Sequence, residues 1–216
     1  MKKVVKLVLL SALALSLFAC NSGSGANGEK NASKKPKVEI SIKDFGVMQA
    51  ELEPEIAPIT VANFLKLVND GFYNGLTIHR VVTDFMIQGG DPTGNGDGGT
   101  GETIKGEFES NGVPNSISHE RGVISMARWG DEPDSASSQF FILQQDAVRH
   151  NEDGTPKTDE NGKPENFLDG EYAAFGRIVS GIEIVDKICE EVKPIDELGT
   201  VDKMDQPVIE YIKVIE

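Results

Sequence analysis

The sequence has few basic residues and few cysteines. Lys and Arg number 21 against 35 Asp and Glu, the formal net charge is −14, and no basic cluster lies beyond Lys37. A protein that neutralises nucleic-acid phosphates needs a basic patch, so nucleic acid is not expected as a partner. The chain has 2 cysteines, which is too few for a disulfide framework.

Several signatures of catalysis and of metal binding are also missing. The sequence contains no HExxH, CxxC, GxSxG or Gly-Lys-Ser/Thr motif, so the common hydrolase and nucleotide-binding classes lose support. The glycine-rich segment 89–101 carries two aspartates and leads into no helix pattern, which disfavours phosphate binding. Asp159, Asn161 and Gly162 match an EF-hand loop, but Lys157 and Leu168 would then occupy its first and last ligand positions. We therefore expect neither a metal site nor a cofactor.

The N-terminus has the layout of a signal peptide. Lys2, Lys3 and Lys6 precede a largely apolar run over residues 7–19 that contains no acidic residue. This run is shorter than the roughly 20 residues of a spanning helix, which favours export over a permanent span. Residues 17–20, Leu-Phe-Ala-Cys, then resemble the bacterial lipobox, in which the cysteine is lipidated and the peptide is cut just before it.

The lipobox resemblance implies a signal peptide over residues 1–19, a lipid on Cys20, and a location on the extracytoplasmic face of the cell membrane. The alternative is an ordinary secretory signal with an incidental cysteine. Loss of three lysines would leave 18 basic against 35 acidic residues, a charge of −17, and such a surface repels anionic headgroups. Attachment would then depend on the acyl chains. Cys189, left without a partner, falls in an apolar helical pattern that predicts a buried, inert thiol.

Two regions follow Cys20. Residues 20–37 are rich in Gly, Ser, Asn and Lys and lack apolar periodicity, which predicts a flexible tether. Residues 38–216 then form the predicted folded domain. Alternating or apolar strand patterns cover 38–42, 48–52, 76–82, 85–88, 122–127, 138–143, 172–179 and 208–215.

Only two helices are predicted in this domain. One opens at Pro58, places Val61, Phe64, Leu65 and Val68 on one face, and stops at residues 69–71, while the other covers 182–189. The polar stretch 145–166 predicts a long surface loop. Many strands with two helices predict a mainly β fold, a closed or nearly closed antiparallel barrel with the helices outside it or at its ends.

One arginine stands in an unusually apolar stretch. Residues 78–91 read Ile-His-Arg-Val-Val-Thr-Asp-Phe-Met-Ile-Gln-Gly-Gly-Asp, with Arg80 among Ile, Val, Phe and Met. A buried charge without a partner is costly. On composition alone, Arg80 either extends its head group to solvent or pairs with a carboxylate such as Asp91.

Four ordered motifs suggest a functional reading instead. Residues 79–91 fit the pattern F-H-R-x-x-x-x-F-M-x-Q-G-G-D, with Ile78 in place of the leading Phe, and Ser-Met-Ala-Arg (125–128), Ser-Ser-Gln-Phe-Phe-Ile (137–142) and Phe-Leu-Asp-Gly-Glu-Tyr-Ala-Ala-Phe-Gly (167–176) follow. From about residue 38 to 216 the chain therefore resembles the cyclophilins, a family of peptidyl-prolyl cis-trans isomerases. The resemblance implies a closed eight-stranded antiparallel β-barrel capped by two helices.

The resemblance also implies a catalytic and peptide-binding site. Arg80 would stabilise the twisted X-Pro bond, and Gln88 would bind substrate backbone or steady the arginine. The implied proline slot and groove wall contain Phe85, Met86, Ala127, Arg128, Gln139, Phe141, Phe167, Leu168 and Tyr172. Phe167 and Tyr172 stand where many eukaryotic cyclophilins have Trp and His, which argues against cyclosporin binding.

Strand alternation separates two neighbouring phenylalanines. It places Gln139 and Phe141 on one face of a strand and Phe140 on the other, so Phe140 is predicted to pack in the core. By the same alternation His79 points away from Arg80 and is predicted to support structure. The partners expected from the resemblance are unfolded or flexible proline-containing polypeptides, acted on by a monomer. A peptide-binding surface lipoprotein or chaperone without turnover is the alternative function.

Overall fold

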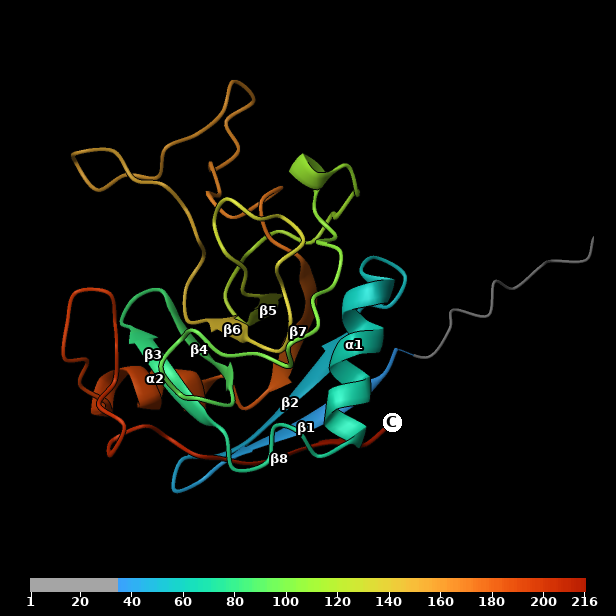
Figure 1. Ribbon diagram of the computed structural model, residues 1–216. Helices are drawn as coiled ribbons and strands as arrows, with labels where there is room; N and C mark the ends of the chain where they lie inside the picture. The colour runs from blue at the N-terminus through green and yellow to red at the C-terminus, as the bar shows by residue number, and fades with distance from the viewer. Residues whose placement is uncertain (1–34) are drawn as a thin grey trace, which may run out of the picture. The chain divides into compact units, whose positions relative to one another are not determined.

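The computed structural model describes residues 35–216 (Figure 1). The predicted signal peptide, Cys20 and most of the predicted tether lie outside the described residues, and the described residues form one compact unit. Within residues 35–216, no helix is both long enough and apolar enough to cross a membrane.

The fold is mainly β, with eight strands in one antiparallel sheet. The strands are β1 (Lys37–Ile42), β2 (Gly46–Leu52), β3 (Thr77–Val82), β4 (Met86–Asp91), β5 (Val123–Met126), β6 (Phe140–Leu143), β7 (Ala174–Ser180) and β8 (Ile209–Val214). Their order across the sheet is β3-β4-β6-β5-β7-β2-β1-β8. All eight coincide with predicted strand patterns, with shifts of at most three residues at their ends.

The sheet curls into an open half-barrel, so the expectation of a closed barrel is wrong. Closure needs continuous pairing between the outer strands, and among the described residues β3 and β8 share no ladder. One isolated bridge joins Thr77 to Val208, with the Ile78 amide donating to the Pro207 carbonyl at 2.9 Å. Farther along, β3 lies against an irregular segment instead: Val81 donates to the Gly199 carbonyl, and Val201 donates to the His79 carbonyl.

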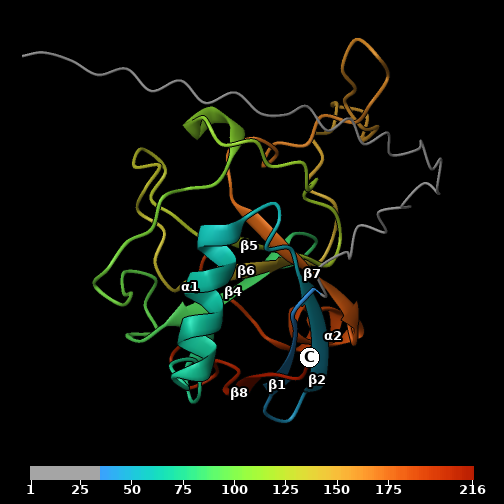
Figure 2. The same ribbon diagram turned by 90° about the vertical axis from the view of Figure 1, so that its right-hand side faces the viewer.

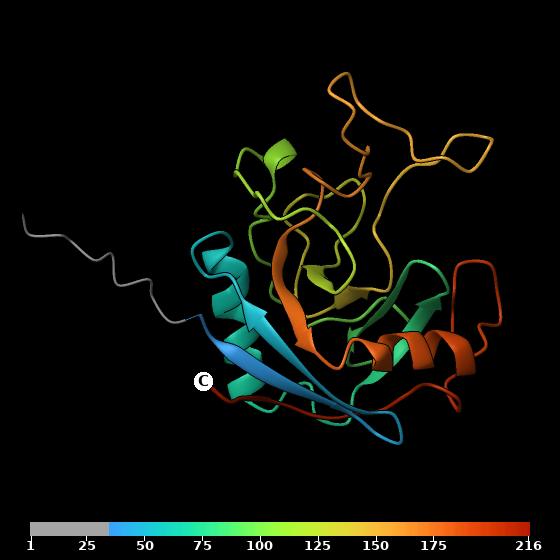
Figure 3. The same ribbon diagram turned by 180° about the vertical axis from the view of Figure 1, so that it is seen from behind.

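Within residues 35–216, two α-helices pack against the sheet. Helix α1 (Pro58–Asn69) begins at its proline and buries Thr60, Val61, Phe64, Leu67 and Val68, while Leu65, predicted for this face, is partly buried. Helix α2 (Glu183–Glu191) buries Ile184, Val185, Ile188 and Cys189. Figure 2 shows α1 in front of the sheet, and Figure 3 shows α2 beside β3 and β4. A short 3₁₀ helix, η1 (Glu109–Asn111), lies between β4 and β5.

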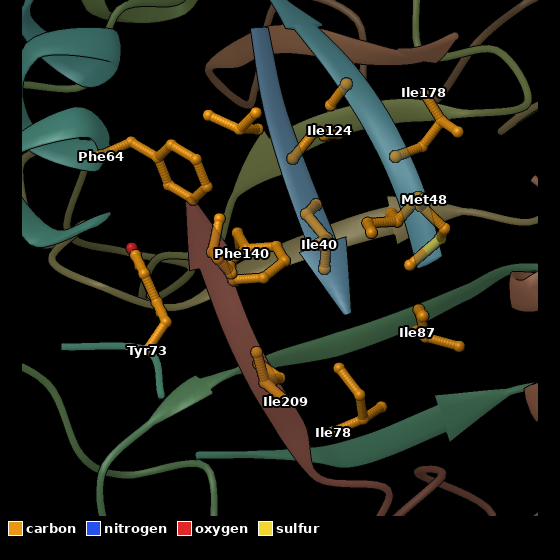
Figure 4. Close-up of a cluster of buried hydrophobic side chains, with 14 of the residues drawn as sticks. Ile40, Met48, Phe64, Tyr73, Ile78, Ile87, Ile124, Phe140, Ile178 and Ile209 are labelled. Carbon is orange, nitrogen blue, oxygen red and sulfur yellow. The ribbon is translucent and has the colours of Figure 1, made fainter. Parts of the chain in front are cut away.

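The main core lies between α1 and the inner face of the sheet. The rings of Phe64, Tyr73 and Phe140 meet there at centroid distances of 5.2 to 5.6 Å, and aliphatic side chains such as Ile40 and Ile209 surround them (Figure 4). Aromatic rings bury large apolar areas, and edge-to-face pairs add further stability. One apolar core thus joins helix α1 to the sheet.

A second, smaller apolar cluster lies on the outer face of β4, β5, β6 and β7. Because side chains alternate along a strand, Phe140 and Ile142 enter the main core while Phe141 and Leu143 enter the second cluster. The prediction that Phe140 packs in the core is therefore confirmed. The other buried members of the second cluster are Met86, Val123, Ala147, Leu168 and Ala174.

The predicted loop 145–166 is exposed and polar, and isolated bridges organise it. Antiparallel bridges join Val148 to Asn166, His150 to Pro156, and Thr158 to Pro164. The segment forms two consecutive hairpin-like turns that project from the sheet (gold to orange in Figure 1).

Candidate active site

Arg80 faces outward because β3 is irregular at His79. Ile78 pairs with Gly89 and Arg80 pairs with Gln88, so His79 is an extra residue in the β3 ladder. A bulge of this kind changes the face on which the following side chain lies. Ile78 and Val81 therefore both enter the main core, while Arg80 between them turns toward the second cluster.

A matching irregularity on β4 restores the register. Thr77 pairs with Asp91 and Ile78 with Gly89, which leaves Gly90 unpaired. Gly90 has φ +87°, and an added Cβ would lie 2.6 Å from the Ser138 carbonyl oxygen. Only glycine suits both conditions.

The guanidinium of Arg80 is held by neutral acceptors. Its Nε donates to the Leu198 carbonyl at 2.7 Å, and its Nη1 donates to Gln88 Oε1 at 3.1 Å and lies 3.9 Å from Met86 Sδ. Burial lowers the pKa of Arg80 from its ordinary value, yet an arginine remains protonated at neutral pH. The site therefore holds a fixed positive charge whose Nη2 makes none of these bonds.

The alternative in which Arg80 pairs with Asp91 is wrong. Asp91 accepts hydrogen bonds from the backbone amides of Thr93, Asn95 and Gly96 and from the Thr93 hydroxyl. Burial alone would raise the pKa of Asp91, but these donors outweigh it and hold the pKa below its usual range. Within residues 35–216, no carboxylate lies within ion-pair distance of Arg80.

Two glutamines connect Arg80 to the glycine-rich loop. Gln88 accepts from Arg80 and donates through Nε2 to Gln139 Oε1 at 2.9 Å. Gln139 Nε2 then donates to the carbonyls of Gly96 and Gly98, both at 2.8 Å. The side-chain oxygen and nitrogen of both glutamines have partners, so the orientation of both side-chain amides is defined.

The predicted site residues gather around one cavity of about 370 Å³. Its lining consists of Arg80, Phe85, Met86, Gln88, Ala127, Arg128, Phe141, Phe167, Leu168 and Tyr172. Gln139, the remaining predicted residue, lines a neighbouring cavity of about 130 Å³ that shares Gln88, Ala127 and Arg128 with the first. Segments far apart in sequence thus converge on the outer face of the sheet.

Aromatic rings form much of the cavity wall. Phe141 and Tyr172 meet edge to face with centroids 5.8 Å apart, and Phe85 and Phe167 lie 5.5 Å apart. Phe141 and Leu168 are 5% and 6% exposed, whereas Phe167 is 36% exposed. The floor is therefore buried and apolar, and the rim is open to solvent.

Arg128 builds the wall between the two cavities. Its guanidinium carbon lies 4.9 Å from the ring centroids of both Phe108 and Tyr172. It also donates to the carbonyls of Glu171, Trp129 and Gly130. Hydrogen bonds to neighbouring carbonyls thus use Nε and Nη1 of Arg128, and its guanidinium contacts two rings, whereas Nη2 of Arg80 makes none of the hydrogen bonds described above.

Sequence reasoning missed several residues near the site. Gly96, Asp97, Gly98 and Ser135 line the smaller cavity, together with Trp129 and with Ser137 of the quoted motif 137–142. They lie in loops without periodic patterns, so only their place in the motif region could have suggested them. The Leu198 carbonyl gave no sequence signal at all, because 118 residues separate it from Arg80.

A series of polar side chains, buried at His119 and Ser125, supports the floor of the cavity. Asp169 Oδ1 lies 3.0 Å from His119 Nδ1, and His119 Nε2 lies 3.0 Å from Ser125 Oγ. The His119 ring stacks on Phe141 at a centroid distance of 6.2 Å. Ser125 and His119 are 0% and 1% exposed, so the triad-like order gives no nucleophile that a substrate could reach. Its effect is to fix the position of Phe141.

The fold and the site together define a class of protein. An apolar recess on the outside of a half-barrel, with a fixed cation and amide groups at its edge, suits an apolar ring attached to a peptide backbone. No residue here is placed as a nucleophile or as a general base, so the geometry favours binding and electrostatic stabilisation over bond cleavage.

Comparison with known proteins identifies the family. A family model described as cyclophilin type peptidyl-prolyl cis-trans isomerase/CLD matches residues 37–215. The chain therefore belongs to the cyclophilin-type peptidyl-prolyl cis-trans isomerases and is an enzyme of that class.

Two curated relatives show the extent of the similarity. Peptidyl-prolyl cis-trans isomerase B of Bacillus subtilis (strain 168) is 44% identical over 142 residues, which are 66% of this chain and 82% of the relative. Peptidyl-prolyl cis-trans isomerase ppi1 of Schizosaccharomyces pombe is 37% identical over 172 residues, 79% of this chain and 91% of the relative.

Solved structures agree with the assignment. The crystal structure of a cyclophilin type peptidyl-prolyl cis-trans isomerase from Cryptosporidium parvum matches with a TM-score of 0.66 at 28% identity, over 84% of this chain and 98% of that one. A second structure of that protein, determined in the presence of the dipeptide Ala-Pro, has a TM-score of 0.65, also at 28% identity, over 83% of this chain and 99% of that one.

Proposed function

We propose that this enzyme isomerises X-Pro bonds in exported polypeptides at the extracytoplasmic face of the cell membrane, with Arg80 as its catalytic residue. The proline ring binds in the cavity formed by Phe85, Met86, Phe141 and Leu168. Gln88 steadies Arg80 and binds the substrate backbone. Ala127, Arg128, Gln139, Phe167 and Tyr172 form the surrounding wall and rim.

The mechanism depends on amide resonance. Rotation about a peptide C–N bond has a barrier of about 18–20 kcal/mol because the nitrogen lone pair is shared with the carbonyl. When the bond twists, that lone pair returns to nitrogen and becomes a hydrogen-bond acceptor. A guanidinium N–H beside the prolyl nitrogen stabilises this twisted state more than either planar isomer, which is the requirement for catalysis.

The observation that carries the proposal is the environment of Arg80. Its cation borders an apolar cavity of about 370 Å³, and its partners are a carbonyl and an amide oxygen instead of a carboxylate. A carboxylate would neutralise the charge, whereas neutral acceptors orient the group and leave the charge available. About 1.4 kcal/mol corresponds to each tenfold in rate, so one charge-assisted hydrogen bond has a large effect.

Arg80→Ala tests the proposal in the full chain. We expect kcat/KM for a proline peptide to fall about 100-fold or more, because roughly 3 kcal/mol of transition-state stabilisation is lost, with an unchanged melting temperature. Arg177→Ala is the matched control, since Arg177 is an exposed arginine on β7 that pairs with Glu120 at 3.3 Å, away from the cavity. Wild-type activity in Arg80→Ala would contradict the proposed role, and tight peptide binding without turnover in the wild type would favour a binding function.

The proposed location rests on the N-terminal sequence. Lysines followed by an apolar run and Leu-Phe-Ala-Cys support export and lipidation at Cys20. Outside the cytoplasm, the enzyme would meet newly exported, unfolded polypeptides, whose X-Pro bonds isomerise slowly without a catalyst. We propose that it acts there as a monomer.

A further inference from the structure

Arg80 is contacted by a segment from the far end of the chain. The turn 195–201, part of the connection between α2 and β8, lies along the outer edge of β3 (red beside green in Figures 1 and 3). Leu198 accepts a hydrogen bond from Arg80 Nε at 2.7 Å. This contact involves the inner nitrogen of the guanidinium and sets the direction of the whole planar group.

Backbone hydrogen bonds fix this turn to β3 on both sides of Arg80. The Val81 amide donates to the Gly199 carbonyl at 2.8 Å, and the Val201 amide donates to the His79 carbonyl at 3.0 Å. Gly199 has φ +89°, and an added Cβ would lie 2.6 Å from the Val81 carbonyl oxygen. The turn therefore approaches β3 as closely as backbone atoms allow.

Asp196 holds the turn in shape. Its Oδ1 accepts from the backbone amides of Leu198 at 3.0 Å and Thr200 at 2.9 Å, and the Ile195 amide donates to the Thr200 carbonyl at 2.8 Å. The two amides that Asp196 binds flank Gly199 and include that of Leu198 itself. The peptide group that carries the Leu198 carbonyl lies between these two amides, and its own N–H, that of Gly199, donates to the Asp196 backbone carbonyl at 3.3 Å. The carboxylate thus restrains the peptide groups on both sides of the Leu198 carbonyl, although it makes no ion pair with Arg80.

We propose that Asp196 is a positioning residue for catalysis, acting through the Leu198 carbonyl to orient the Arg80 guanidinium toward the prolyl nitrogen. This inference rests on the catalytic role proposed for Arg80. The Leu198 carbonyl accepts from Arg80 Nε, so the outer nitrogens of the guanidinium remain for Gln88 and the substrate. Substrate affinity comes from the apolar cavity, so the turn affects turnover more than binding.

Asp196→Ala in the full chain tests this role. Loss of one orienting contact corresponds to about a threefold to tenfold fall in kcat, with KM within about twofold of the wild type. Asp196→Asn keeps an oxygen acceptor at the same place, so most of the activity should return. An Asp196→Asn enzyme as slow as Asp196→Ala would contradict the proposal, because charge rather than turn geometry would then be responsible.

Asp202→Ala is the matched control. Asp202 is also exposed, lies in the same connection, and accepts from the Met204 amide at 3.0 Å in a similar turn, but it makes no contact with Arg80. It should retain wild-type kcat. An equal loss in Asp202→Ala would show that general loosening of the connection is responsible, and would overturn the specific role of Asp196.

A double-mutant cycle with Arg80→Lys completes the test. Lysine keeps the charge but has no Nε–H for Leu198, so Asp196→Ala should slow the Arg80→Lys enzyme by less than twofold. The same threefold to tenfold loss in both backgrounds would overturn the proposal. Full activity in Arg80→Ala would instead overturn the proposed role of Arg80, whereas a slow Arg80→Ala with a fully active Asp196→Ala would overturn only the role of Asp196.

Discussion

His79 and Arg80 are adjacent residues of β3 with opposite environments. His79 is 4% exposed, and neither of its ring nitrogens has a hydrogen-bond partner among the described residues. Arg80 borders the open cavity. The bulge at His79 separates them, and it keeps a neutral ring beneath the glycine-rich loop while the cation reaches the site.

Burial of His79 predicts a pH-dependent stability. Burial is the largest influence and, with the charge of Arg80, lowers the pKa of His79 below 6.5, although Asp91 opposes the shift. The unfolded chain then binds more protons than the folded chain below pH 6.5, so stability is complete above that pH and declines as the pH falls. Denaturant unfolding between about pH 7.5 and 5 should show this decline.

The variant His79→Gln should flatten that pH dependence, whatever its effect on stability at neutral pH. His150→Gln is the control, since His150 is exposed in the projecting segment 145–166, and it should keep the wild-type slope. An identical slope in His79→Gln and in the wild type would rule out His79 as the source.

The residue types of the site were predictable from the sequence, but their orientation was not. Alternation separated Phe140 from Phe141 correctly, because both lie in a regular strand. The outward direction of Arg80 depends on the paired irregularities at His79 and Gly90, which leave no distinct pattern in the sequence. The hydrogen bond that Arg80 donates to the Leu198 carbonyl joins distant segments and depends on the tertiary fold alone.

At the scale of elements, helix α1 is capped by a residue from another part of the chain. Ala57 at its N-cap has no side-chain acceptor. Glu107 supplies both acceptors instead, receiving the Ile59 amide at 3.0 Å and the Thr60 amide at 2.7 Å. Glu107 is 2% exposed, so these charge-assisted bonds are shielded from water.

Glu107→Gln should therefore destabilise the protein. The substitution keeps the size of the side chain but replaces one acceptor with an NH₂ donor that faces a backbone amide, at a cost of about 1–3 kcal/mol in the free energy of unfolding. Thermal or denaturant unfolding measures the loss. Glu109→Gln removes an exposed carboxylate two residues along and should change stability by less than about 0.5 kcal/mol; equal losses in the two variants would contradict the capping role.

The number and kind of elements followed from the sequence, whereas closure of the sheet did not. Apolar residues recur with a period of two in strands and of 3.6 in helices, and both periods are local properties of the sequence. Whether β3 meets β8 depends on the path of the connection after α2, whose turn at Gly199 occupies the edge of β3 instead. No local pattern predicts such an arrangement.

At the scale of the whole molecule, charge and attachment are linked. The excess of acidic residues, 35 against 21 basic, repels anionic lipid surfaces, so electrostatics cannot hold the domain at a membrane. A lipid on Cys20 would supply the attachment. Cys189, the other cysteine, is 2% exposed, and burial raises the pKa of its thiol to about 12, which makes it unreactive.

Replacing each cysteine in turn by alanine distinguishes the proposed lipid attachment site, Cys20, from the buried thiol of Cys189. Cys20→Ala should release the protein into the soluble fraction, because no acyl chain is then attached. Cys189→Ala should leave it with the membranes, since the buried thiol has no part in attachment. Fractionation followed by immunoblotting measures both, and Cys20→Ala retained in the membrane fraction would contradict lipidation at Cys20.

The cavity lies on the outside of the curled sheet, not within it, and this determines what can enter. A polypeptide need not be threaded through a ring or offered by one of its ends. A proline in the middle of a long chain can lie across the open rim beside Phe167 and Trp129, 36% and 52% exposed, while folded segments on either side remain in solvent. We therefore expect the length of the substrate to set no limit, with only the few residues around each proline needing to be unstructured.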